Sequence, residues 1–436
     1  MRTKPSMSSS LRTSFAPIFL FAGLIALSGC GRGSNSPSTG LPVTPPAGQT
    51  NSYVGQPGNS PSQTSLWNVT IDRSANTYSF GPISGSGTAT SGSIATLSNV
   101  SNFVILLDQN GYQNGLAVEV PGQAAILRPG NTSAPLIFAV QQPSCFAIGG
   151  NVKFFYVLSP GLSGINTAFF GQIYADTSGD GSTWQFNNQT NFTSPYEFQV
   201  NEGSDVPSDA TFPGYPAGYP ATCSGANGAA ATVSASPLAY FDQGANSYAV
   251  PTQFVISPGG LFFENQNYTN VPTGQGWPYV NVASWGVSEP PEPVVVGNLA
   301  PANYLGFLFE SNPGVGLYRT RLVGFGNLPI SGTVLTGGTF PSEDPSQVSA
   351  DNMSVTFNGQ DPLNNGMFYQ ATLTIPNDDP SQFTGGCLSY SISQAGTSTC
   401  TNDGVAMVSV QNGLVTIIMG ATDTSGNQRT LVLFQQ

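Results

Sequence analysis

Leu66–Arg73 reads LWNVTIDR, a short run rich in β-branched and aromatic residues. Runs of this composition favour β-strands, and the first half of the chain contains several more of them. They are Thr77–Ile83, Phe103–Asp108, Gly115–Val120, Pro135–Gln142, Phe154–Leu158 and Ala168–Ala175. Clusters of Gly, Pro, Asn and Ser break the chain about every 8–12 residues, a spacing typical of antiparallel sandwiches and barrels.

The second half of the chain repeats this pattern. Its runs are Leu238–Gln243, Gln253–Ile256, Leu261–Asn265, Tyr279–Trp285, Tyr304–Glu310, Gly316–Phe325, Met353–Asn358, Met367–Ile375, Val405–Val410, Val415–Ala421 and Thr430–Gln435. Recurring Pro-Gly pairs such as Pro121-Gly122 indicate type II turns, and no stretch shows sustained helical periodicity. The predicted fold is all-β, with antiparallel sandwich or barrel-like sheets in two β lobes.

The domain boundaries follow from changes in composition. Residues 1–29 are predicted to be a signal peptide, and residues 30–52 a flexible tether that has almost nothing to bury. The segment Glu202–Ala230 is irregular and rich in Pro, Gly and Tyr, so we place a boundary near Ala230. This gives a first β lobe at 53–230 and a second at 231–436.

The charge balance excludes several classes of function. The chain has 10 basic and 22 acidic residues and no histidine, so Ser-His-Asp and Cys-His catalytic arrangements are excluded. Three of the basic residues precede residue 30, and the rest of the chain carries a net charge of −15. Such a chain has no positive surface with which to bind nucleic acid.

The N-terminus has the three parts of an export signal. Arg2, Lys4 and Arg12 precede an apolar run, Phe15–Leu27, that is too short to span a bilayer. The sequence Leu27-Ser28-Gly29-Cys30 then resembles the lipobox of bacterial lipoproteins. This resemblance implies that Cys30 carries acyl chains such as palmitate and that the lipid anchor alone holds the protein at the membrane. Gly31, which stands where an Asp would favour the inner membrane, is compatible with an outer-membrane or cell-surface location.

Four further cysteines, Cys145, Cys223, Cys387 and Cys400, predict two disulfides with three possible connectivities. The pairs Cys145–Cys223 and Cys387–Cys400 are favoured, because the second closes a short loop. No spacing typical of a zinc site is present, so structural staples are the expected role.

Several carboxylates end apolar runs and suggest an alternative function. Asp108, Asp242, Glu264 and Glu310 occupy such positions, and a carbohydrate-active hydrolase needs two carboxylates close together. An acid followed by Gln, Asn or Ser also marks the point where a strand leaves the core and turns. The sequence favours this second interpretation.

The segment Asp176–Gly181 resembles the opening of a calcium loop, with candidate ligands Asp176, Ser178 and Asp180. The position expected to hold a bidentate Glu holds Asn187 instead. A Gly-rich hairpin turn explains the segment equally well, so calcium is the only cofactor suggested.

Aromatic residues supply the last candidate site. Trp67 and Trp184 lie within β-type runs and are expected in the core, whereas Tyr215, Tyr219 and Trp277 lie among Gly and Pro. The latter three predict a binding loop for a glycan or an envelope protein, because aromatic rings offer rigid contact area. The sequence thus favours a binding or structural module of the cell envelope over a hydrolase, with a subunit of an envelope complex as a third possibility.

Overall fold

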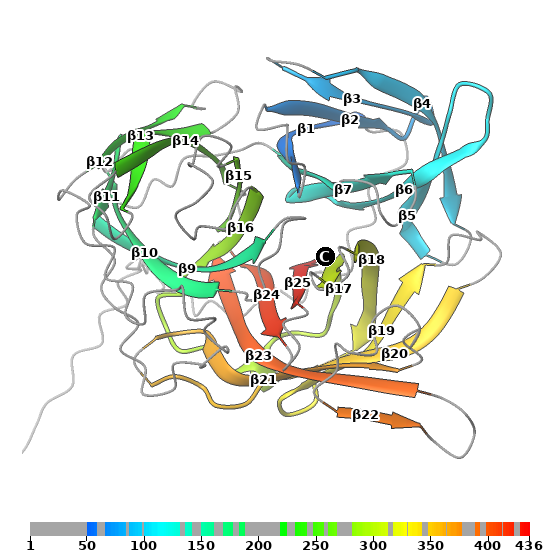
Figure 1. The fold of residues 1–436 in the computed structure, drawn as a ribbon. Coiled ribbons are helices and arrows are strands. Elements are labelled where there is room, and N and C mark those ends of the chain that lie inside the picture. The colour runs from blue at the N-terminus through cyan, green and yellow to red at the C-terminus, as the bar shows by residue number, and fades with distance from the viewer. Residues whose placement is uncertain are drawn as a thin grey trace, which may run out of the picture. The chain divides into compact units, whose positions relative to one another are not determined.

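The computed structural model describes residues 50–58, 66–83, 87–97, 100–130, 136–141, 150–160, 169–177, 183–187, 219–224, 232–241, 247–256, 260–267, 281–312, 317–328, 330–341, 348–362, 364–376, 389–392, 398–411, 413–422 and 428–436. These residues form strands almost throughout (Figure 1), which confirms the predicted all-β class. Among them, no helix is long and apolar enough to cross a membrane.

The first eight strands form a closed antiparallel barrel, barrel 1, in which each strand pairs with the next and β1 pairs with β8. Its strands are β1 (Thr50–Gly58), β2 (Trp67–Asp72), β3 (Thr77–Pro82), β4 (Thr90–Leu97), β5 (Val100–Leu107), β6 (Gln113–Val120), β7 (Ala124–Pro129) and β8 (Leu136–Gln141). Strand β1 begins inside the segment predicted to be tether.

The next eight strands close a second antiparallel barrel, barrel 2, through the pairing of β16 with β9. Its strands are β9 (Gly150–Pro160), β10 (Phe169–Thr177), β11 (Thr183–Asn187), β12 (Tyr219–Ser224), β13 (Thr232–Phe241), β14 (Ser247–Ile256), β15 (Leu261–Asn267) and β16 (Asn281–Ser288).

The remaining strands form a nine-stranded sheet that also closes on itself. They are β17 (Ala302–Asn312), β18 (Leu317–Leu328), β19 (Val334–Pro341), β20 (Val348–Thr356), β21 (Met367–Pro376), β22 (Ser389–Ile392), β23 (Ser398–Gln411), β24 (Leu414–Thr422) and β25 (Gln428–Gln435). Strand β21 pairs with both β20 and β23, and β25 pairs with β17. Eight strands therefore complete a ring, barrel 3, and β22 is attached to the side of β23.

The interior of barrel 1 is filled by side chains. Strand β2 alternates, with Trp67, Val69 and Ile71 buried and Asn68 exposed, because successive residues of a strand point to opposite faces. The inward residues of all eight strands form one apolar cluster, in which the rings of Trp67 and Phe80 stack with centroids 5.9 Å apart. The interior of barrel 3 is filled in the same way by a second cluster that includes Leu308, Val355 and Leu433.

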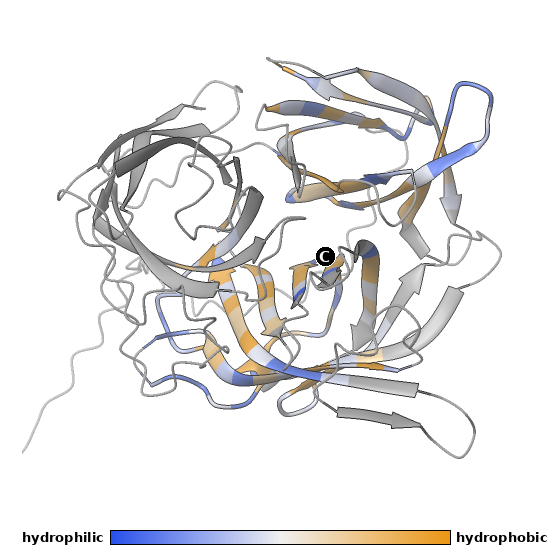
Figure 2. Ribbon diagram, in the orientation of Figure 1, coloured by the Kyte–Doolittle hydropathy of each residue, from blue (hydrophilic) through white to orange (hydrophobic). Residues whose placement is uncertain are grey.

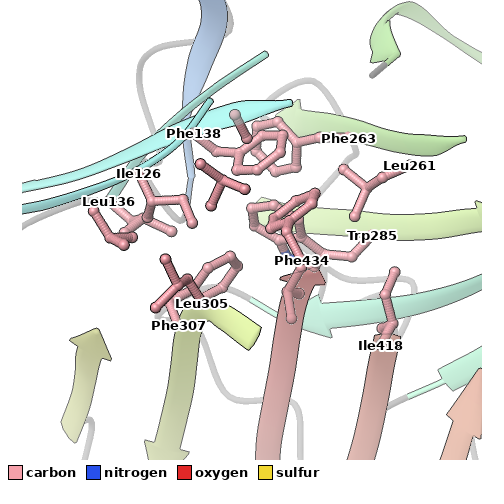
Figure 3. Close-up of a cluster of buried hydrophobic side chains, with 14 of the residues drawn as sticks. Ile126, Leu136, Phe138, Leu261, Phe263, Trp285, Leu305, Phe307, Ile418 and Phe434 are labelled. Atoms are coloured by element: carbon pink, nitrogen blue, oxygen red, sulfur yellow. The ribbon is translucent and has the colours of Figure 1, made fainter. Parts of the chain in front are cut away.

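The outer faces of several strands are also buried, because the barrels share a third apolar cluster, the central core. Strands β7 and β8 are buried on both faces, so they contain continuous apolar runs such as LIFAV (Figure 2). Phe138 of β8 contacts Phe263 and Trp285 of barrel 2 and Phe434 of barrel 3, with ring centroids 5.4, 5.1 and 5.9 Å away (Figure 3). The described parts of the three barrels accordingly belong to one compact unit.

Polar contacts reinforce this junction. Gln123 Nε2 donates to the backbone carbonyl of Gln435 at 2.6 Å, and Arg128 Nη1 donates to that of Thr320 at 3.3 Å. Both bonds join barrel 1 to barrel 3. They place polar partners around an otherwise apolar interface, where unpaired groups would be costly.

The Pro-rich segment Glu289–Pro293, which follows β16, begins an ordered connection between barrels 2 and 3. The backbone N–H of Asn365 donates to Glu289 Oε1 at 2.8 Å, and Gln360 Nε2 donates to the carbonyl of Val294 at 3.0 Å. Val294 and Val296 pack into the interior cluster of barrel 3. The third barrel thus holds the connection at its start and in its middle.

The predicted division near Ala230 does not coincide with a sheet boundary. Strands β12 and β13, on either side of it, pair as neighbours within barrel 2. The sheets change between β8 and β9 and again between β16 and β17, so the strands form three barrels where the sequence indicated two lobes. The segment predicted to be irregular also contains a strand, β12.

The type II turn predicted at Pro121-Gly122 is present. The N–H of Gln123 donates to the carbonyl of Val120 at 3.0 Å, and Gly122 has a φ of 79°. A positive φ at this position strains any residue with a Cβ, which is why Gly follows Pro here.

Candidate functional site

The hairpin between β5 and β6 presents an aromatic side chain on a rigid turn. The carboxylate Oδ1 of Asp108 accepts the backbone N–H groups of Asn110 and Tyr112 at 2.8 and 2.9 Å. Two backbone bonds complete the turn, from Gly111 N to the Asp108 carbonyl at 3.0 Å and from Asp108 N to the Tyr112 carbonyl at 2.8 Å. Tyr112 is nevertheless 73% exposed, the largest exposed fraction among the large hydrophobic side chains of the described residues.

The same end of barrel 1 carries a second exposed apolar side chain. Because the strands alternate in direction, the β1–β2, β3–β4, β5–β6 and β7–β8 connections share one end of the barrel, here called the loop end. Ile83 follows β3 at this end and is 47% exposed, and its backbone N–H donates to the Leu66 carbonyl at 2.7 Å. The loop end therefore combines fixed backbone with exposed apolar groups.

A buried ion pair fills the opposite end of barrel 1. Glu119 is fully buried, and Oε1 accepts Asn51 Nδ2 at 2.7 Å and the Tyr53 hydroxyl at 2.6 Å. Arg73 Nε donates to Oε2 at 2.8 Å. Burial and the neighbouring Glu119 carboxylate raise the pKa of the Tyr53 phenol far above its ordinary value, so the phenol stays protonated and donates.

The β2–β3 turn beside this ion pair is fixed by Asp72. Its carboxylate accepts the hydroxyl of Ser74, the backbone N–H of Ala75 and the hydroxyl of Thr50. These bonds stabilise the ionised form and lower the pKa of Asp72 to about 2. The residue thus shapes a turn.

Barrel 3 contains a second buried ion network on its interior face. Glu310 of β17 is fully buried and receives a bidentate contact from Arg321 of β18, with Nε–Oε2 and Nη2–Oε1 distances of 2.9 and 3.0 Å. Arg429 of β25 adds a third bond, from its Nε to Oε1 at 3.2 Å, and donates through Nη1 to Asn402 Oδ1 at 3.0 Å. The network ties together three adjacent strands and β23.

Several charged side chains, inside and outside these two networks, are buried and so do not contribute charge to the surface. Arg73, Arg128, Arg321 and Arg429 are buried or nearly so, with the acids Glu119, Glu310 and Asp361. Outside this buried set, the chain after residue 29 has three basic and 19 acidic residues, a net charge of −16. Any partner meets a molecule that is almost free of exposed positive charge.

The structure places two of the four predicted carboxylates in structural roles. Asp108 ends β5 and fixes the hairpin turn, as the strand-end interpretation predicts. Glu310 lies inside barrel 3, paired with two arginines. Glu264 lies in β15 with only its backbone described, and Asp242 lies outside the described residues.

The predicted calcium ligands fall at the β10–β11 hairpin. Asp176 lies in β10 with its backbone opposite Gln185 of β11, whereas Ser178 and Asp180 lie outside the described residues. Antiparallel pairing of these two strands fits the hairpin interpretation. No group of three metal-ligating side chains occurs within the described ranges.

The structure describes two of the four cysteines that are predicted to form disulfides. Cys145 and Cys387, like the lipidation residue Cys30, lie outside the described residues. The backbones of Cys223 and Cys400 lie in β12 and β23, where they face Val233 and Tyr390 respectively. Both pairings remain predictions.

Most of the predicted aromatic loop also lies outside the described residues. This applies to Tyr215 and Trp277, whereas the backbone of Tyr219 begins β12 and pairs with Phe186. Trp67 is 5% exposed and lies in the core as predicted. The sequence interpretation missed Tyr112, which the preceding Asn110-Gly111 turn signal could have indicated as a hairpin tip.

No protein-family model matches this chain, and a search of curated protein sequences found no match. Among solved structures, a mutant of the vaccine antigen transferrin binding protein B from Haemophilus parasuis Hp5 is similar at 8% identity. The match covers 89% of this chain and 76% of the other, with a TM-score of 0.29. A superposition this weak supports no inference about function.

Proposed function

We propose that this chain is a lipid-anchored binding module of the cell envelope, whose barrels present loops to a glycan or protein partner. Acylated Cys30 would hold it at the outer membrane or cell surface, and the segment before β1 would separate it from the lipid. The proposal rests on one structural observation above all: the interiors of barrels 1 and 3 are occupied by side chains of the chain itself.

Filled interiors favour contact at the barrel ends. Eight-stranded barrels either pack their interior with side chains or keep room for one small ligand. Here rings such as Trp67 and Phe80 fill barrel 1, and the Glu119 ion pair lies at one end of it. A ligand inside barrel 1 would have to displace the rings and the ion pair, so the loops at the barrel ends are the better candidates for contact.

The shared core supports a rigid framework for those loops. Phe138 packs against rings from the two other barrels, so their described parts have one common interior. Loops on a rigid framework lose less conformational entropy on binding. This favours binding by preformed surfaces.

The experiment compares the two modes of binding. The mature protein, from residue 30 onward, would be incubated with solubilised cell-envelope fractions and, separately, with a fluorescent fatty acid. We expect saturable capture of an envelope component and no saturable binding of the fatty acid. Saturable fatty-acid binding that competes with envelope capture would place the ligand inside a barrel and refute the proposal.

A further inference from the structure

We propose that the tip of the β5–β6 hairpin, Gln109–Gln113, is a binding site for a neutral glycan, with the ring of Tyr112 as its platform. This inference rests on the proposed function and names the ligand class and the residues. The starting observation is an ordered turn whose aromatic side chain is exposed. The turn is fixed by four hydrogen bonds, yet the aromatic ring it carries is largely exposed.

The ring of Tyr112 contributes little to folding. A side chain that remains 73% exposed buries little apolar area, so its removal changes the folded structure little. Its backbone is nonetheless held by the Asp108 carboxylate and by a backbone bond. A ring on a preorganised backbone binds a ligand at a low cost in entropy.

The neighbouring side chains have the chemistry that hydroxyl groups require. Gln109, Asn110 and Gln113 are exposed amides, each of which both donates and accepts hydrogen bonds. Figure 2 shows the hydrophilic character of this hairpin. A sugar presents hydroxyls at its edge and a C–H surface on its face, which match the amides and the aromatic ring respectively.

The charge of the molecule selects a neutral ligand. The hairpin tip contains no charged residue, and the only acid beside it, Asp108, accepts the backbone bonds of the turn. Outside the buried networks the chain carries a net charge of −16, which repels anionic polysaccharides. The tip also lacks the cluster of apolar anchors that is typical of protein interfaces.

The test measures the affinity of the mature protein for neutral polysaccharides (dextran, mannan and galactan) and for anionic alginate, by affinity electrophoresis. We expect binding to at least one neutral polysaccharide and weaker binding to alginate. Tyr112→Ala should weaken the neutral binding about tenfold or more, and Tyr112→Trp should keep it. Val295→Ala, which removes an exposed side chain elsewhere, is the matched control and should bind like the wild type.

A second pair of variants tests the preorganised turn. Asp108→Ala removes the acceptor of the two N–H groups and should weaken binding while leaving the ring in place. Asp108→Asn keeps a side-chain oxygen and should restore most of the affinity.

Three outcomes would overturn the proposal. Neutral polysaccharide binding that Tyr112→Ala leaves unchanged would place the site elsewhere. Failure of all polysaccharides, together with capture of an envelope protein that Tyr112→Ala abolishes, would replace the glycan by a protein and leave the proposed function intact. Failure of both kinds of partner would refute the proposed function as well.

Discussion

Replacing Glu310 by Gln should destabilise the protein strongly, because it removes a carboxylate to which two buried or nearly buried arginines donate. Arg321 and Arg429 have side chains 15% and 1% exposed, and both donate to the carboxylate of Glu310. In Glu310→Gln a neutral amide replaces the carboxylate, so the summed charge of these three side chains rises from +1 to +2. Breaking a buried pair in this way costs about 3–5 kcal/mol.

The expected change in melting temperature follows from the size of the unit. The 387 residues from Thr50 to Gln436, with an unfolding entropy of about 2.1 cal/mol/K per residue, give about 0.8 kcal/mol/K. A loss of about 3–5 kcal/mol therefore lowers the melting temperature by about 4–6 °C, measurable by differential scanning calorimetry.

Two controls make this prediction refutable. Glu292→Gln changes the same groups at an exposed position and should be nearly neutral. Replacing Glu310, Arg321 and Arg429 together by Met should recover much of the lost stability, because none of the three charges is then left buried without a partner. A Glu310→Gln variant that melts within about 1 °C of the wild type would refute the argument that this network is buried and mutually dependent.

Three further predictions concern the core, a close approach of two strands and an acid-sensitive turn. Phe138→Ala should lower the free energy of unfolding, measured with denaturant, by about 3–5 kcal/mol, because it leaves a cavity where rings from three barrels meet. A loss below about 1 kcal/mol would mean that these rings do not pack together. Gly92→Ala should lower the free energy of unfolding by about 1–3 kcal/mol, because a Cβ would lie 1.9 Å from the carbonyl oxygen of Leu107. An unchanged midpoint of urea unfolding would contradict this close spacing of β4 and β5. The pKa of Asp72 is lowered to about 2, so its ionised form stabilises the fold fully above pH 4 and this contribution is lost as the pH falls towards about 2. Asp72→Asn should show a smaller loss of stability between those pH values than the wild type, and an identical acid dependence would rule out the contribution of this turn.

The fold class followed from local sequence because strand composition and turn signals are local properties. Trp67, Val69 and Ile71 alternate with polar residues as a strand with one buried face requires. Strand β4 was missed because its sequence, TSGSIATL, reads as a turn cluster. Gly92 stands there because β4 and β5 approach too closely for a Cβ.

The number of barrels did not follow from local sequence, because closure depends on strands that are distant in the chain. Barrel 3 closes only where β21 pairs with β23 and β17 with β25. Nothing in Met367–Pro376 specifies β23 as its partner rather than the intervening β22. Local composition predicts a strand, and the shared core determines its neighbours.

The candidate site residues show the same difference between what local sequence predicts and what depends on distant strands. An acid at a strand end was correctly interpreted as a turn residue at Asp108. The identical signal at Glu310 marks a buried ion network, since its partners Arg321 and Arg429 come from neighbouring strands. Exposure of Tyr112 likewise depends on the position of its hairpin at the loop end, which composition alone does not give.

The three barrels share one apolar core, and we expect them to unfold as a single framework. Hydrogen exchange of the mature protein, followed by mass spectrometry, tests this common unfolding most directly. We expect amides of β8, β16 and β25 to exchange through the same global opening and to lose protection together in Phe138→Ala. Exchange of the barrel 1 strands through an independent opening, with barrel 3 still protected, would contradict the claim.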